Sequence, residues 1–241
     1  MTGTEIRSPR WEEVPALEEI WREAFPEDTE GEIGDFFALG FAPERSLALY
    51  REDRPVSVLY WFDGVWGGSA FAYLYAVATR KAERGRGYST RLMEAACERL
   101  TKSGYDGALL VPAEPGLFRF YGRLGFEACC PKKRQRISSA VGREPLTPRE
   151  YETARRDYLR PGDGVLVGPA LDYFGAEGEF YESVDGVLAL EGVPETGGPA
   201  TEGFGGAVVP AEEDGPASPL AMFRALRPGV QAPERFFMTL E

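Results

Sequence analysis

The stretch Arg84-Gly85-Arg86-Gly87-Tyr88-Ser89 lies between a run typical of a strand and a run typical of a helix. Residues 70–79 are apolar and aromatic and follow two glycines, as in a buried strand. Apolar residues then recur at helical spacing over 92–100. A glycine turn that opens a helix directs several backbone N–H groups to one point, where the helix dipole adds positive potential. The stretch therefore predicts an anion-binding loop, with a plain surface turn or an RNA-binding tract as the alternatives.

A second segment extends this pattern. Residues 108–111 are typical of a short apolar strand, residues 112–116 interrupt it, and Phe118-Arg119-Phe120-Tyr121-Gly122-Arg123-Leu124-Gly125-Phe126 follows. Strand, R-G-x-G loop, helix, strand and F-Y-x-x-L-G-F, in this order, resemble the GCN5-related N-acetyltransferase (GNAT) family. The resemblance is strongest over 73–126 and extends over about residues 6–143. It implies an α/β fold with a mixed α+β sheet, and acetyl-coenzyme A (acetyl-CoA) as the co-substrate.

The resemblance also implies a set of cofactor-binding residues. In the family, the loop holds the pyrophosphate of acetyl-CoA, and the strand before it separates from its neighbour and bonds the pantetheine arm with free backbone groups. Two positions depart from the family pattern: Ser89 replaces a frequent glycine or alanine and either bonds or obstructs the phosphates, and Glu114 replaces a frequent asparagine. We expect Glu114 at the rim of the site or facing the acceptor. Carried over, the cofactor-binding residues are Val77, Thr79, Arg84, Gly85, Arg86, Gly87, Tyr88 and Ser89.

Tyr121 matches the tyrosine of the family motif and is the predicted general acid. The reference pKa of a phenol is about 10 and that of a thiol about 8.5, so passing a proton to the departing thiolate costs little. The alternative is a core tyrosine, because the apolar residues around it have the pattern of a packed helix and turn.

The composition excludes several kinds of site. The chain contains no histidine, which removes Ser-His-Asp and Cys-His catalysis and histidine-ligated zinc. Its three cysteines, Cys97, Cys129 and Cys130, support neither a disulfide framework nor a Cys-x-x-Cys metal site, so we predict no metal. Direct acetyl transfer to an amine needs no covalent enzyme intermediate, so a site without histidine suffices.

Charge divides the chain into two parts. Residues 1–143 hold 20 Lys+Arg and 21 Asp+Glu, whereas residues 144–241 hold 7 and 18, with 14 Gly and 11 Pro. We therefore predict a GNAT acetyltransferase domain over 1–143 and an acidic, turn-rich α+β domain over 144–241, a candidate degenerate second GNAT-like fold. A Thr147-Pro148 helix start and strands at 164–168 and 180–190 are expected in it. It would shape the acceptor side or form an oligomer interface, as in a homodimer.

Other elements of the first part follow from periodicity. Residues 15–25 and 32–41 predict two amphipathic helices, and residues 46–51 and 56–62 predict a hairpin. Residues 134–141 are expected to supply the last strand of the sheet.

The amine acceptor is the least determined part. Residues 27–35 are strongly acidic and belong to a region that borders the acceptor cleft in such folds, so they would attract a cationic amine. The alternative is an ordinary solvated loop whose carboxylates lie at the start of a helix. Half of the aromatic residues Tyr60, Trp61, Phe62 and Trp66 are expected to line the same cleft and half to be core.

The sequence thus predicts an acetyl-CoA-dependent N-acetyltransferase that acts on a small-molecule or peptide amine. The acidic chain argues against nucleic acid or membrane partners, and the lack of a long apolar run or a signal-like start predicts a cytoplasmic protein. A second function remains open, a non-catalytic acyl-CoA sensor or interaction protein. An RNA-binding loop is the third and fits the acidic charge least.

Overall fold

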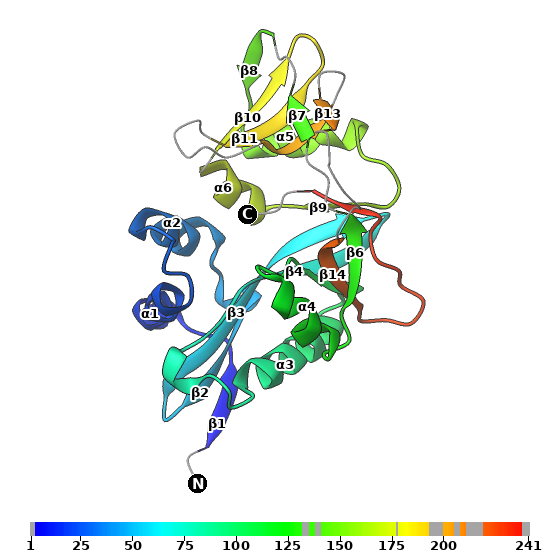
Figure 1. Ribbon diagram of the computed structural model, residues 1–241. Helices are drawn as coiled ribbons and strands as arrows, with labels where there is room; N and C mark the ends of the chain where they lie inside the picture. Colours follow the sequence, from blue (N-terminus) through cyan, green and yellow to red (C-terminus); the bar gives the residue numbers. More distant parts are fainter. Residues whose placement is uncertain are drawn as a thin grey trace.

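A computed structural model describes residues 3–131, 135–137, 141–176, 178–192, 200–204, 208–210 and 219–237. Its centre is a twisted sheet in which the strands lie in the order β1-β2-β3-β4-β5-β14-β6, with β9 paired to the far end of β3 and β15 paired to β9 (Figure 1). The β4–β5 and β9–β15 pairs are parallel, and the other pairs are antiparallel. The bounds are β1 (Thr4–Arg7), β2 (Ser46–Arg51), β3 (Arg54–Trp66), β4 (Ser69–Thr79), β5 (Gly107–Leu110), β6 (Glu127–Pro131), β9 (Asp163–Leu166), β14 (Pro219–Ala225) and β15 (Arg235–Phe236).

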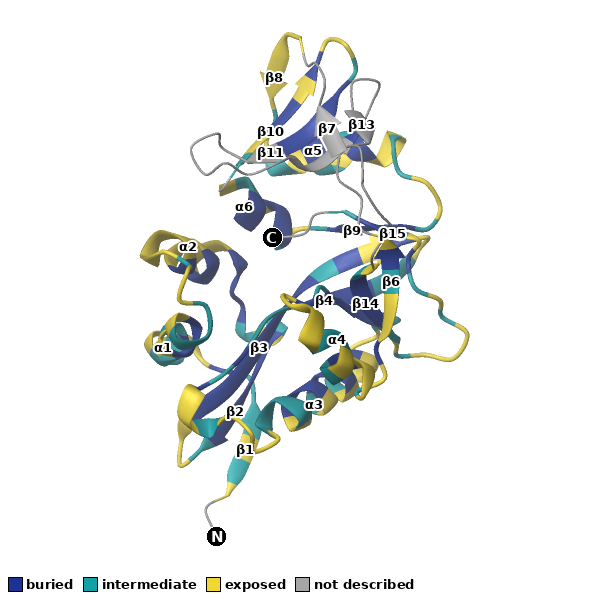
Figure 2. Cartoon of the chain, in the orientation of Figure 1, coloured by how far each residue is buried: buried dark blue, intermediate teal, exposed yellow. Residues whose placement is uncertain are grey.

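Helices cover both faces of this sheet, so its central strands are buried on both sides (Figure 2). One face carries α1 (Val14–Ala24), α2 (Glu30–Asp35) and a π-helical turn (Phe36–Gly40). The other carries α3 (Tyr88–Lys102) and α4 (Pro115–Gly122). The two predicted N-terminal helices and the α3 helix are confirmed, and short 3-10 turns occupy Trp11–Glu13, Pro43–Arg45, Lys81–Glu83 and Arg155–Asp157.

The predicted hairpin is confirmed in β2 and β3. Glu52 and Asp53 form its turn with φ of 52° and 60°. These are left-handed conformations, which aspartate adopts more readily than most residues, so Asp53 suits the turn. Beyond the turn, β3 runs for 13 residues and supplies aromatic side chains to both faces of the sheet.

β14 lies between β5 and β6 in the central sheet, and the prediction that residues 134–141 supply the last strand of that sheet is wrong for residues 135–137, while 134 and 138–140 lie outside the described residues. β7 (Gln135–Ile137) instead pairs with β13 (Val208–Pro210) in a separate two-stranded sheet. β14 carries an almost wholly apolar run, in which Ala221 and Phe223 face the α1 side and Met222 faces the α3 side. A strand between two neighbours must be apolar on both faces, which the charged 134–141 segment is not.

Apart from β9, the described residues between β6 and β14 form a second, smaller unit, at the top of Figure 1. Its four-stranded sheet has the order β12-β11-β10-β8, from β8 (Arg143–Pro145), β10 (Gly178–Ser183), β11 (Leu188–Gly192) and β12 (Ala200–Phe204). The predicted helix start is confirmed in α5 (Pro148–Ala154), where Thr147 and Glu150 form a capping box. The second helix, α6 (Pro169–Ala176), packs on the π-helical turn and β3.

The boundary predicted at residue 143 therefore does not separate two sheets, because β9, β14 and β15 lie in the central sheet. The small sheet also shares one buried cluster with the α1 face of the central sheet, through residues such as Phe180 and Leu190. The described residues between β6 and β14 thus form an insertion between two neighbouring strands of the central sheet, and among them β9 returns to that sheet.

Candidate active site

The end of β4 is separated from its neighbour. β4 pairs with β5 only from Phe71 to Tyr73, yet it continues along β3 as far as Thr79. The β3–β4 register shifts between Tyr75 and Ala78, and Ala76 has a φ of 46°, so the strand bulges at this point. The predicted separation is present, and Val77 and Thr79 lie on the segment that β5 does not cover.

The loop that follows has the shape of an anion site. Gly85 and Gly87 have φ of 78° and 75°, and no atom lies within 4 Å of the position that a Cβ would take on either residue. The first backbone bond of α3 runs from the Arg91 N–H to the Gly87 carbonyl at 3.1 Å. The N–H groups at the first turn of a helix have no partner inside the helix, so those of Tyr88 and Ser89 are available to a ligand.

The two loop arginines also bind protein groups. Arg84 Nε donates to the Thr79 carbonyl at 3.1 Å, which ties the loop to the end of β4. Arg86 Nε lies 3.3 Å from a Glu83 carboxylate oxygen, and Glu83 also pairs with Arg51 at 3.0 Å. The Arg86 side chain is about half exposed and paired with Glu83. Solvent and this carboxylate both screen its charge, so Arg86 attracts an anion at the loop less strongly than an unpaired arginine would.

Arg80 anchors the start of this loop, and the sequence pattern did not indicate it. Its side chain is 8% exposed. It donates to the Glu19 and Glu23 carboxylates at 2.8 and 2.9 Å, and to the carbonyls of Pro55 and Ala16 at 3.1 and 3.2 Å. These bonds join the end of β4 to α1 and to the β2–β3 turn.

Tyr121 lies near the C-terminal end of α4 and is 7% exposed. It belongs to the buried cluster on the α3 face, against which Val77 and Tyr88 also pack. The fold therefore places the predicted tyrosine, the open strand and the loop around one cluster. Burial alone raises the pKa of Tyr121 to about 12, and no group in the described part of the chain hydrogen-bonds its hydroxyl. The phenol is protonated at neutral pH and free to donate.

Glu114, the second departure, is exposed at the residue that precedes α4. Its side chain makes no capping hydrogen bond there. Its place at the rim of the site or facing the acceptor stays a prediction.

The acidic segment 27–35 is largely committed to structure. Asp28 accepts a hydrogen bond from Trp21 Nε1 at 2.7 Å, and burial raises the pKa of Asp28. Glu30 pairs with Arg22 at 2.7 Å, and Glu32 bonds the Thr29 N–H at 2.6 Å in a capping box. The helix-start alternative therefore accounts for these three carboxylates.

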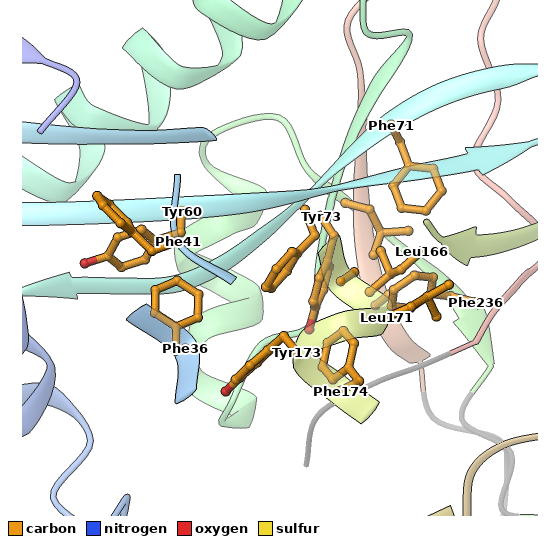
Figure 3. Close-up of a cluster of buried hydrophobic side chains, with 14 of the residues drawn as sticks. Phe36, Phe41, Tyr60, Phe71, Tyr73, Leu166, Leu171, Tyr173, Phe174 and Phe236 are labelled. Carbon is orange, nitrogen blue, oxygen red and sulfur yellow. The ribbon is translucent and has the colours of Figure 1, made fainter. Parts of the chain in front are cut away.

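The four aromatic residues of β3 do not divide into cleft and core as expected, because all four are buried. Tyr60, Phe62 and Trp66 face the α1 side, whereas Trp61 faces α3. Figure 3 shows the α1-side cluster, in which α6 contributes Tyr173 and Phe174. The insertion thus covers aromatic surface that would otherwise border a cleft.

Tyr75 is one of several partly exposed residues that pack against this cluster, and it lies next to the β4 bulge. Its hydroxyl and that of Tyr173 lie 3.2 Å apart. Burial raises the pKa of Tyr75 well above its usual value, so Tyr75 stays protonated at neutral pH. These two hydroxyls are polar groups on the α1 side that sequence reasoning missed, because Tyr173 comes from the insertion.

Comparisons with known proteins support the fold and the family. No curated protein sequence matched the chain. The solved structure of a GCN5-related N-acetyltransferase from Kribbella flavida is 18% identical, with a TM-score of 0.68, over 93% of this chain and 71% of that one. A probable N-acyltransferase from Enterococcus faecalis is 16% identical, with a TM-score of 0.64 over 94% and 73%. A putative acetyltransferase from Pyrococcus horikoshii is 13% identical, with a TM-score of 0.63 over 100% and 95%.

The similarity to these structures extends through the insertion, since each match covers more than nine-tenths of this chain. Among the described residues, no helix is both long and apolar enough to cross a membrane. A family model for the acetyltransferase (GNAT) domain matches residues 5–129, just over half of the sequence. The chain is a member of the GNAT acetyltransferase family.

Proposed function

We propose that this protein transfers an acetyl group from acetyl-CoA directly to a primary amine. One observation carries the proposal: a loop with two left-handed glycines opens α3 beside the uncovered end of β4, and Tyr121 packs in the same cluster as residues of both. Family membership supports the same reaction type.

The loop and the strand end would bind the donor. The N–H groups of residues 85–89 would hold the pyrophosphate, and the open space beside Gly85 and Gly87 lets phosphate oxygens approach the backbone. We assign the pantetheine arm to the backbone of Val77 and Thr79. The Thr79 carbonyl already accepts from Arg84, and its second lone pair can accept another bond.

Tyr121 would act on the departing thiolate mainly as a hydrogen-bond donor. With a pKa of about 12, complete proton transfer to a thiolate whose conjugate acid has a pKa of about 8.5 is uphill by roughly 5 kcal/mol. A hydrogen bond to a charged acceptor stabilises it by about 1.5–3 kcal/mol without moving the proton. The buried position of the phenol thus favours donation over release.

The acceptor would enter on the α1 side, where Tyr75 reaches the surface beside the β4 bulge. A primary amine must lose its proton before attack. We propose a small-molecule or peptide amine, drawn by the exposed carboxylates near α2 when it is cationic.

Two measurements test the proposal. CoA should raise the unfolding temperature, and acetyl-CoA with a panel of amines should release free thiol. Stabilisation without thiol release from any amine would favour the sensor function instead, and no stabilisation by CoA would refute both.

A matched pair of glycine variants tests the loop itself. Gly87→Ala and Gly104→Ala each place a Cβ on a left-handed residue, with φ of 75° and 95°, at opposite ends of α3. Both should lose stability through backbone strain. Only Gly87→Ala should weaken CoA binding, by about 10–100-fold if one charge-assisted hydrogen bond is lost. Equal CoA affinity in the two variants would place the phosphates elsewhere.

A further inference from the structure

Two adjacent cysteines on β6 face the same side of the sheet. Successive residues of a regular strand point to opposite faces. Cys130, however, has a φ of 53°, a left-handed conformation that is rare for a residue with a side chain. Cys130 is buried in the cluster on the α1 face, and Cys129 packs against that same cluster while partly exposed. The backbone conformation therefore brings two thiols together that strand geometry would separate.

Burial and a hydrogen bond to the backbone hold the thiol of Cys130 in place. Cys130 is 5% exposed, and its Sγ donates to the Pro233 carbonyl at 3.2 Å. The neighbouring Cys130 thiol lowers the pKa of Cys129, whereas Cys129 and burial raise the pKa of Cys130.

Strand registers place the pair relative to the candidate active site. Cys129 pairs with Ala221 of β14, and the adjoining residue of β14, Met222, pairs with Leu110 at the end of β5. Cys129 is therefore two strands from the point where β5 ends, on the face that carries α1 and α6. The pair lies outside the loop and the Tyr121 cluster.

We propose that Cys129 and Cys130 form a dithiol site for a soft, thiophilic centre with two open bonding positions, of which a trivalent arsenical is the model. Soft thiolate ligands select such centres, and the more acidic, partly exposed thiol attacks first. With phenylarsine oxide, two S–As bonds form and the As–O bond breaks. The oxygen leaves as water with the two thiol protons, and neither sulfur nor arsenic changes oxidation state.

Both thiols pack against the cluster on one face of the sheet, so one arsenic atom can bind the two sulfurs without either side chain crossing to the other face. Cys97 supplies an internal comparison: it is a single buried thiol on α3, on the opposite face of the sheet. A lone thiol forms one S–As bond, which an excess of a monothiol reverses. Two bonds to adjacent residues close a ring, and release of the arsenical then requires a competing dithiol.

The test uses the full chain, phenylarsine oxide and intact-protein mass spectrometry. One arsenical per chain should survive excess 2-mercaptoethanol and be removed by 2,3-dimercaptopropanol. Cys129→Ser and Cys130→Ser should each lose this resistance to the monothiol, whereas Cys97→Ser should keep it. Loss of the arsenical to the monothiol in the native protein, or resistance retained by Cys130→Ser, would overturn the proposal.

If the Cys130 variant fails to fold, a second measurement on the native protein tests the proposal. In the native protein, bound phenylarsine oxide should protect the peptide containing Cys129 and Cys130 from alkylation after denaturation, and leave the Cys97 peptide reactive. Protection of the Cys97 peptide alone, or of neither peptide, would equally refute a dithiol site.

Discussion

Replacing Arg80 by methionine should destabilise the protein substantially, because this buried guanidinium joins three elements at the start of the loop. Methionine keeps the length of the side chain and removes four hydrogen bonds, two of them to carboxylates. Breaking a fully buried ion pair costs about 3–5 kcal/mol.

The Glu19 and Glu23 side chains are 57% and 35% exposed, so water can solvate them once Arg80 is gone. We therefore expect a loss of about 2–3 kcal/mol in the free energy of unfolding. For a chain of this size, that corresponds to a fall of about 4–12 °C in Tm.

Arg54 provides the matched control. It lies 3.7 Å from the same Glu19 carboxylate, but its side chain is 65% exposed. Arg54→Met should cost only about 0–1 kcal/mol, as exposed pairs do. Urea unfolding of both variants, followed by circular dichroism, measures the difference. If Arg80→Met unfolds within error of Arg54→Met, the four bonds do not stabilise the loop, and the reasoning from burial is wrong.

Three further predictions concern chemistry, the insertion and pH. Tyr121→Phe should lower kcat by about 10–100-fold and leave CoA affinity unchanged. Because the pKa of Tyr121 is about 12, the difference in kcat should persist to pH 10. Unchanged turnover in the variant would exclude the donor role. Asp163→Asn should lower the free energy of unfolding, measured in urea, by about 2–4 kcal/mol, because the buried Asp163 carboxylate pairs with Arg235 and joins β9 to β15. A loss of only about 0–1 kcal/mol, as for an exposed ion pair, would contradict this. Arg7 lowers the pKa of Glu13 to about 2, below its unfolded value, so this stabilisation is present above about pH 5 and lost as the pH falls toward 2. Glu13→Gln should accordingly be less stable than the native protein by about 1–3 kcal/mol at pH 6 and nearly equal at pH 2, and a gap that stays constant with pH would refute the assignment.

The sequence predicted those parts of the site that depend on local pattern. Two glycines before an amphipathic helix fix a left-handed loop and an open helix start, and both are present at Gly85 and Gly87. The F-Y-x-x-L-G-F motif placed Tyr121 in a short helix and turn. The helix start at Thr147 was equally local, since its capping partner is three residues away.

Features that depend on contacts between residues far apart in the sequence could not be predicted from the local sequence pattern. The carboxylates that bind Arg80 are 61 and 57 residues away, so nothing near Arg80 signals its burial. The aromatic run of β3 was ambiguous for the same reason, because α6 of the insertion covers one of its faces. The strand between β5 and β6 was missed because residues 219–225, far along the chain from both neighbours, supply it, and only the pairing with β5 and β6 identifies it.

The position of β14 also constrains how the chain can fold during synthesis. Leu109 of β5 pairs with Phe223, so β5 and β6 each present an unpaired edge until the ribosome has released residues 219–225. Exposed strand edges pair readily with other chains. A fragment ending at residue 143 would keep both edges permanently and should aggregate, although it contains the loop, Tyr121 and every residue that the family model matches. For expression or for grafting this catalytic module, the useful unit is therefore the span that ends beyond β14.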